Sequence, residues 1–201
     1  MCIAAGHDQH QIPQRRKCTH VGRNAKTVHI MKHVFILLTT LLAISICSNG
    51  QDSTLLKRTP YTLRVDVDKD HFYEDKVGGT PYVFPDKTIQ IYPGETIYVE
   101  VVEENGVVKN MTAVQKIKNP SITLTITFTQ TTKNKVHEMM MLKIENPFPK
   151  DLSYNATMFL FKQNRWADTD VYPVTAKLSA FETWNDIIIT LGLGNWKFID
   201  K

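Results

Sequence analysis

The sequence predicts an all-β protein, a single immunoglobulin-like antiparallel β-sandwich over residues 51–201, with a jelly roll or a partly closed barrel as the alternative. Three observations support this class. Apolar and polar residues alternate with the period of a strand in several short segments, turn-forming residues separate these segments, and no segment has the period of an amphipathic helix. The cysteine pair and strand tryptophan of antibody domains are missing, so only the architecture is predicted.

Alternation is clearest between residues 121 and 161, where three strands follow one another. Along Ile122–Thr129 apolar residues alternate with threonines, which places one face of the strand in a core and the other in water. The strand Val136–Glu145 is apolar on both faces in its middle, as expected of a central strand. After a turn with two prolines, Leu152–Leu160 alternates again. The pattern predicts an antiparallel meander whose shared apolar face is covered by a second sheet.

Four strands are predicted before this stretch, at 61–68, 88–92, 96–103 and 107–117. A long polar connection, residues 69–86, separates the first two. Asn105-Gly106 between apolar runs is the favoured sequence of a two-residue hairpin turn. Pro93-Gly94 marks a second turn, because proline fixes φ and glycine accepts a positive φ.

The C-terminal part is predicted with less regular elements. Residues 170–178 contain a strand near a sheet edge, since Pro173 cannot donate to a ladder. Residues 181–185 are expected to form a short helical turn or a loop. An apolar strand, 187–193, follows and ends in a turn at Gly194-Asn195.

The first 50 residues are predicted to lie outside the domain. Residues 1–30 have neither helical nor strand period, and we interpret them as a mis-assigned extension before the true start at Met31. From there, residues 31–50 have a short basic start and the 14-residue apolar run Val34–Cys47, which is too short for a membrane-spanning helix and fits a secretory signal peptide. Small residues at Ser48 and Gly50 predict cleavage before Gln51.

An alternative processing route uses Cys47 as the acylated residue of a lipoprotein. The residue before it, Ile46, is larger than a lipoprotein signal requires, so simple cleavage is the main prediction. The protein is therefore expected to be periplasmic or extracellular, and it contacts a membrane only if Cys47 is lipidated.

Charge and cysteine content exclude several classes of function. The sequence has 24 basic and 20 acidic residues, of which six basic and one acidic lie in residues 1–50. The rest of the chain therefore has 18 basic and 19 acidic residues, a net charge of −1. Nucleic-acid binding through a basic face is therefore not predicted. All three cysteines also lie in the first 50 residues, so the domain contains no disulfide and no thiolate site.

No catalytic motif is recognisable, and we predict that the protein is not an enzyme and has no cofactor. The domain has no cysteine, no Gly-x-Ser-x-Gly sequence, and only two histidines, His71 and His137. Asp66, Asp68 and Asp70 resemble the start of a calcium loop. His71 stands where that loop requires glycine, so we interpret these residues as a solvated strand end.

A copper site is the alternative function that the residues leave open. His137, Met139 and Met141 share the parity of one strand face, and imidazole and thioether are ligands that suit copper in an exported protein. The competing interpretation is that methionine fills the core here, as Met140 and Met158 are expected to do.

An interaction surface is predicted from the same parity. If Met140, Leu142 and Ile144 enter the core, Met139 and Met141 point outward. Phe159 and Phe161 then point outward from the next strand, so that the two pairs form one apolar patch on neighbouring strands. Such a patch fits a protein partner or a homodimer. The alternative is a cover from the same chain, by residues 69–86 or 181–184.

Three segments, Tyr98–Gly106, Leu142–Phe148 and Tyr154–Leu160, resemble exported bacterial immunoglobulin-like β-sandwich proteins that have no assigned activity. The resemblance implies the fold and export and transfers no site residues. Together with the observations above, it predicts an exported, non-enzymatic module that binds a protein partner or packs into an envelope assembly.

Overall fold

The computed structural model describes residues 55–199, and the predictions on residues 1–50 lie outside that range. The described residues form strands and connections without a helix. The strands are β1 (Tyr61–Asp66), β2 (Phe72–Val77), β3 (Ile89–Ile91), β4 (Glu95–Glu104), β5 (Val107–Val114), β6 (Thr123–Lys133), β7 (Val136–Glu145), β8 (Asp151–Leu160), β9 (Arg165–Thr169), β10 (Ser179–Trp184) and β11 (Ile188–Ile199).

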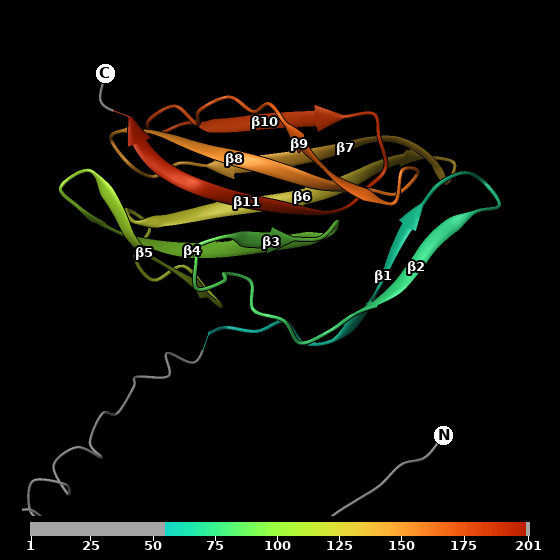
Figure 1. Cartoon of the computed structure of the whole chain (residues 1–201), viewed down its shortest axis with the longest axis horizontal. Coiled ribbons are helices and arrows are strands. Elements are labelled where there is room, and N and C mark those ends of the chain that lie inside the picture. The colour runs from blue at the N-terminus through green and yellow to red at the C-terminus, as the bar shows by residue number, and fades with distance from the viewer. Residues whose placement is uncertain (1–54, 200–201) are drawn as a thin grey trace, which may run out of the picture. The chain divides into compact units, whose positions relative to one another are not determined.

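Two antiparallel sheets form a sandwich. The five-stranded sheet has the order β10-β7-β6-β4-β5, and the four-stranded sheet has the order β3-β11-β8-β9. In Figure 1, β11 and β8 cross in front of the strands of the five-stranded sheet. This confirms the predicted all-β antiparallel sandwich, and the sheets do not close into a barrel.

Strand period explains which side chains form the core. Alternate residues of β6 point inward, and Leu124, Ile126 and Phe128 are fully buried. On β7 the alternate residues Met140, Leu142 and Ile144 are buried, as their parity predicted. Burying each such side chain contributes about 1.5–3 kcal/mol, so the two facing sheets are held together mainly by these inward residues.

Tight turns lie where the sequence places them. Asn105 and Gly106 have φ values of 54° and 78°, which is the left-handed conformation that a type I′ hairpin turn needs, and this confirms the predicted turn between β4 and β5. Asn134 and Lys135 have φ values of 52° and 63° and join β6 to β7 in the same way.

The predicted meander over residues 121–161 is wrong in its last step. β6 and β7 pair with each other, but β8 pairs with β11 and β9 in the opposite sheet. The buried Asn146 forms the corner, where its Nδ2 donates to the carbonyls of Lys150 (2.9 Å) and Val174 (3.0 Å) and its Oδ1 accepts from the Phe148 N–H (2.9 Å). These bonds satisfy the backbone where the chain leaves one sheet for the other.

Two segments that were predicted as irregular are strands. Phe72–Val77, within the predicted connection 69–86, is β2. Its side chains Tyr73 and Val77 are at least partly buried, but the three charged residues between them obscure the strand pattern in the sequence. Residues 179–184 are β10, which pairs with β7, and not a helical turn. Each of these strands has a charged or solvated face, which weakens the apolar alternation that sequence analysis depends on.

Two further boundaries differ from the prediction near the C-terminus. The strand lies at Arg165–Thr169, before the predicted range 170–178, where only an isolated bridge between Val174 and Leu152 forms. β11 does not end at Gly194-Asn195 but continues to Ile199 through a shift in register between Gly194 and Lys197. Asn195 has a φ of 53°, so the residues that resemble a turn form a bulge inside the strand.

The hairpin of β1 and β2 forms a third, two-stranded sheet with its own small core. Leu63, Val65 and Val77 of the hairpin pack against Ile187 and Ile189 beside the four-stranded sheet. Two side chains connect the hairpin to the five-stranded sheet, Tyr61, whose hydroxyl donates to Glu95 of β4, and Gln130 of β6. Gln130 accepts from the Asp66 N–H (3.0 Å) and donates to the Asp66 carbonyl (2.6 Å), so its amide replaces a strand partner for β1.

Candidate binding groove

The outer face of the four-stranded sheet lacks side chains at two neighbouring positions of β11. Gly192 is opposite Thr157 and Gly194 is opposite Asn155 on β8, while Leu193 between them points into the core. Neither glycine has a positive φ, so backbone conformation does not require glycine at these sites.

The close approach of neighbouring side chains does favour glycine at one of the two sites, Gly192. A Cβ at Gly192 would lie 2.9 Å from the Thr157 Oγ1 and 4.0 Å from the Trp166 ring, and a Cβ at Gly194 would lie 3.4 Å from the Thr88 Oγ1. Side chains from β8, from β9 and from the segment before β3 therefore lie close to the bare backbone. Glycine inside a strand is typical of sites where another group approaches the backbone closely.

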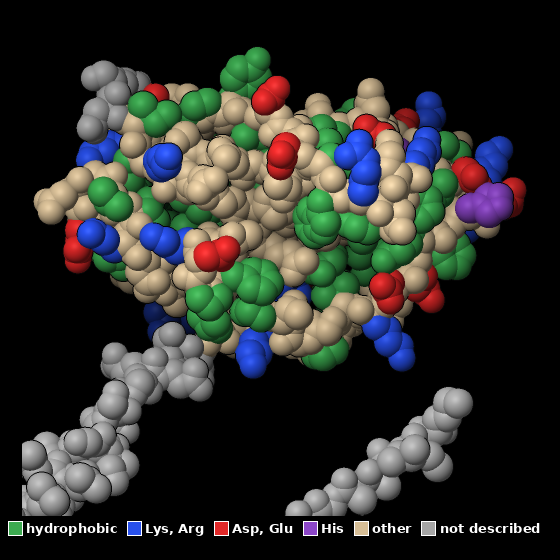
Figure 2. Space-filling view, viewed as in Figure 1, with side chains coloured by type: hydrophobic (Ala, Val, Ile, Leu, Met, Phe, Trp, Pro, Cys, Tyr) green, Lys and Arg blue, Asp and Glu red, His purple; other side chains and the backbone are tan. Residues whose placement is uncertain are grey.

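Polar side chains surround this bare strip. They enclose an open hollow of about 440 Å³, whose lining residues are Asp86, Thr88, Asn155, Thr157, Asp168, Gly192, Gly194 and Asn195. Figure 2 shows the face, and its middle is formed mainly by backbone and uncharged polar side chains. We call this hollow the polar half of the outer groove.

The two carboxylates of the polar half differ in their surroundings. Asp86 accepts hydrogen bonds from the Thr88 backbone N–H (3.0 Å) and the Thr88 hydroxyl (3.0 Å), and both hold the pKa of its carboxyl below the usual range. Asp168 is opposite Thr157 on β9. Within residues 55–199, no hydrogen bond or ion pair engages the Asp168 carboxylate, so it is available to a ligand.

The groove continues along the same strands into a second half with a mixed lining of aromatic, aliphatic and charged side chains. The register places Thr190, Phe159 and Trp166 side by side on β11, β8 and β9, two positions along from Gly192. The hairpin of β1 and β2 forms the opposite wall, and the hollow between them measures about 260 Å³. Its other aromatic and polar lining residues are Tyr73, Asp75, Lys76, Gln90 and Tyr92.

Trp166 is the aromatic side chain at the junction of the two halves. It is 49% exposed, and Phe159 contacts it at 5.5 Å between ring centroids and an interplanar angle of 70°. The ring also reaches the space above Gly192. Phe159 therefore fixes the ring by an edge-to-face contact, while about half of the tryptophan surface stays in water.

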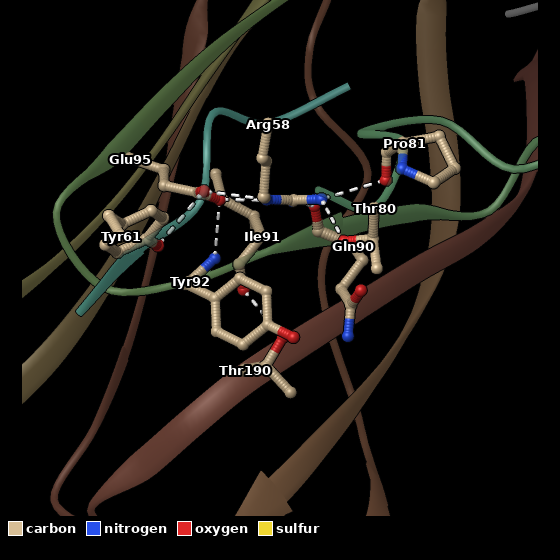
Figure 3. A network of polar contacts seen from close by, with 9 residues as sticks. All are labelled: Arg58, Tyr61, Thr80, Pro81, Gln90, Ile91, Tyr92, Glu95 and Thr190. Carbon is tan, nitrogen blue, oxygen red and sulfur yellow. Dashed lines mark hydrogen bonds and ion pairs between the residues drawn. The ribbon is translucent and has the colours of Figure 1, made fainter. Parts of the chain in front are cut away.

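A buried ion pair supports the groove from below (Figure 3). Arg58 is 2% exposed, and its guanidinium contacts Glu95 through Nε to Oε1 (2.7 Å) and Nη2 to Oε2 (3.1 Å). The same guanidinium donates to the carbonyls of Pro81 (2.8 Å) and Gln90. Because Gln90 belongs to β3 and lies opposite Gly192, this bidentate pair fixes the edge of the groove.

Aromatic rings complete this network. The Arg58 guanidinium lies 4.3 Å from the centroid of the Tyr82 ring and 5.2 Å from that of Tyr92. Tyr61 donates its hydroxyl to Glu95 (3.1 Å), and burial together with that carboxylate raises the pKa of Tyr61 well above its usual value. The cluster joins the segment before β1 to β3 and β4, and we interpret it as a structural anchor.

The three candidate copper ligands do not share a face, which corrects the sequence prediction. Met139 is opposite Thr131 and His137 is opposite Thr132, so Glu138 is an extra residue in a bulge. Consecutive residues of β6 point to opposite faces, and the bulge therefore moves His137 to the face opposite Met139 and Met141.

Both ring nitrogens of His137 have protein partners. Nδ1 accepts from the Gln130 amide (3.0 Å), and Nε2 donates to the Asn185 carbonyl (3.1 Å). This histidine helps to hold Gln130, which in turn pairs with β1. Among the described residues, no three His, Cys, Asp or Glu side chains are grouped as metal ligands.

The predicted apolar patch is divided between the two sheets. Met139 and Met141 lie on β7 of the five-stranded sheet, whereas Phe159 lies near the end of β8 in the other sheet and Phe161 directly follows that strand. The expectation that these are neighbouring strands is wrong. The two phenylalanines are half-buried by their own chain, with Tyr73 of β2 packing edge-to-face on Phe161 at 5.8 Å.

The acidic residues at the end of β1 stabilise a turn. Asp68 accepts from the backbone N–H of Asp70 and of His71, both at 3.0 Å, and contacts the His71 ring at 2.8 Å. The first of these bonds is the main cause of a lowered pKa for Asp68. This agrees with the interpretation as a solvated strand end.

Sequence reasoning missed the groove, although one signal pointed to it. Leu191-Gly192-Leu193-Gly194 places two glycines on one face of an otherwise apolar strand.

Comparison with known proteins gave no match among family models, curated proteins or solved structures. No helix within residues 55–199 has the length and apolar character needed to cross a membrane.

Proposed function

We propose that this chain is an exported, non-enzymatic module that binds an envelope component in the outer groove. The observation that carries the proposal is the strip of bare backbone at Gly192 and Gly194, surrounded by polar side chains from three other segments. Concave sites with a few convergent polar groups are the usual location of ligand binding. Export is supported by the signal-peptide pattern of residues 31–50.

The chemistry of the groove supports binding more than catalysis. Of the two carboxylates, Asp86 has a lowered pKa, whereas a general acid needs a raised one. The two histidines of the domain lie elsewhere, and His137 has partners on both nitrogens. A binding site needs only the available polar groups and the exposed part of Trp166.

The test is sedimentation of the exported protein with the insoluble envelope fraction of the cells that secrete it. Gly194→Gln fills the groove with a side chain that the backbone accepts. Thr129→Gln is the matched control, because Thr129 lies on the outer face of the five-stranded sheet. We expect Gly194→Gln to weaken binding at least about tenfold, which corresponds to ~1.4 kcal/mol, and Thr129→Gln to leave it unchanged.

Two results would contradict the proposal. Equal binding by the wild type and Gly194→Gln would exclude the groove as the binding site. Release of soluble product from the envelope by the wild type, lost in Asp168→Asn, would show an enzyme instead of a binding module.

A further inference from the structure

We infer that the ligand of the outer groove is a neutral glycan that stacks a sugar ring on Trp166 and hydrogen-bonds to Asp168 and Asn155. This inference rests on the proposed function, since it names the ligand of the same site. Three properties of the groove carry it: its charge, its hydrogen-bonding groups and its one half-exposed aromatic ring.

Charge disfavours an anionic ligand in the polar half of the groove, whereas the other half is lined by both Asp75 and Lys76. The side chains of the polar half are two carboxylates, two amides and two hydroxyls, without a lysine, arginine or histidine. Phosphate and sulfate groups, uronic acids and nucleic acids bind through cationic side chains, and the two carboxylates would repel them.

The available polar groups match hydroxyls. A carboxylate accepts hydrogen bonds, and an amide both donates and accepts, while a sugar hydroxyl does both. Within the described residues, the side chains of Asp168, Asn155 and Asn195 have no hydrogen-bond partner, and all three are exposed. They surround the glycines, so a ligand on the bare strip meets acceptors and donors from three strands.

Trp166 supplies an apolar platform beside these groups. The C–H groups of one face of a sugar ring are apolar and weakly positive, and they pack on the negative face of an aromatic ring. With 49% of its surface in water, Trp166 has area left to bury, and Phe159 already fixes its orientation. The platform and the polar groups are adjacent because Trp166 and Asp168 point outward from the same strand.

An extended peptide does not fit this site in the usual way. A peptide that adds to a sheet needs the free backbone of an edge strand. β11 is paired with β8 on one side and, from Leu191 to Leu193, with β3 on the other, so the backbone at Gly192 lies between two partner strands. Recognition at Gly192 therefore depends mainly on side chains.

The test is affinity electrophoresis of the exported protein in gels that contain one soluble polysaccharide each. The neutral probes are a β-glucan, a xylan, a mannan and a galactan, and the anionic probes are alginate and heparin. We expect at least one neutral polysaccharide to retard the protein and neither anionic one to do so. Trp166→Ala and Gly194→Gln should each weaken the retardation about tenfold or more.

Phe181→Ala is the matched control, because Phe181 is 58% exposed on the other sheet. It should leave retardation unchanged, and thermal unfolding should show that all variants are folded. Should Trp166→Ala not fold, Gly194→Gln decides the result. The inference is overturned if no neutral probe retards the protein, if only anionic probes do, or if Phe181→Ala has the same effect as Trp166→Ala. In the first case, envelope binding that still depends on Gly194 would leave the proposed function intact.

Discussion

The two outer faces of the sandwich are built from the same strand period but differ in what they present to solvent. On the five-stranded sheet, β6 carries threonines at every outward position from Thr125 to Thr131, and β7 adds Met139 and Met141. On the four-stranded sheet, the equivalent positions of β11 include Gly192 and Gly194. The first face is covered by its own side chains, whereas the second exposes backbone at the two glycines. This difference is the reason for proposing the second face, and not the first, as the binding site.

The largest expected effect comes from the anchor below the groove. Arg58→Met leaves Glu95 buried without its cation, and we expect the free energy of unfolding to fall by about 3–5 kcal/mol. Urea denaturation measures it. The double variant Arg58→Met, Glu95→Leu should lose clearly less, because no unpaired charge stays buried. A double variant as unstable as the single one would show that the ion pair itself stabilises the fold.

The second-largest expected loss of stability comes from a substitution of Asn146, at the corner where the chain passes from one sheet to the other. Asn146→Ala removes four side-chain hydrogen bonds and leaves the buried Phe148 N–H without its partner, for an expected loss of about 2–3 kcal/mol. Denaturant unfolding checks this against Asn110→Ala, an exposed residue of β5 that should change stability by less than ~0.5 kcal/mol. If Asn146→Ala and Asn110→Ala reduced stability equally, the hydrogen bonds of Asn146 would not be what stabilises the passage of the chain between the two sheets.

A smaller effect compares the two faces directly. Gly192→Val places a Cβ 2.9 Å from the Thr157 Oγ1, and the overlap should destabilise the fold by about 1–3 kcal/mol. Thr129→Val on the opposite face should stay within ~0.5 kcal/mol of the wild type. Melting temperatures of the two variants measure the contrast. If both are neutral, the groove is not as closely packed as the distances indicate.

The smallest effect concerns the groove carboxylate. Thr88→Val removes the hydroxyl bond to Asp86 and should raise the pKa of that carboxyl toward its usual range, which an NMR titration measures. The sign of the pH dependence follows from the lowered pKa. Asp86 stabilises the folded protein above its unfolded-state pKa, and this contribution is lost as the pH falls through the lower folded-state pKa. An unchanged titration would assign the shift to the Thr88 backbone N–H alone.

Local sequence patterns predicted the features that depend on one strand or one turn. The inward residues of β6 and β7 and the Asn105-Gly106 turn follow from alternation and from backbone preference, and the structure confirms them. Pairing depends on residues far apart in the chain, so the change of sheet at Asn146 was missed. A single extra residue, Glu138, was enough to reverse the parity on which the copper prediction depended.

The groove could not be predicted for the same reason. Its residues come from the segment before β3 and from β8, β9 and β11, which are brought together only by the register of the four-stranded sheet. Neither Asp168 nor Asn155 has a sequence context that distinguishes it from other surface residues. Only the spacing of Gly192 and Gly194 was visible in advance.

The attachment of the β1–β2 hairpin has a consequence for motion. The hairpin is joined to the five-stranded sheet through the Gln130 amide, the Tyr61 hydroxyl on Glu95 and one backbone bond, from the His137 N–H to the Val67 carbonyl (3.3 Å), and not through a continuous ladder. Its small core is separate from that of the sandwich. We therefore expect the amide hydrogens of the hairpin to exchange before those of β6 and β11, which hydrogen-exchange measurements would check. Because it is one wall of the groove, opening of the hairpin would widen the groove.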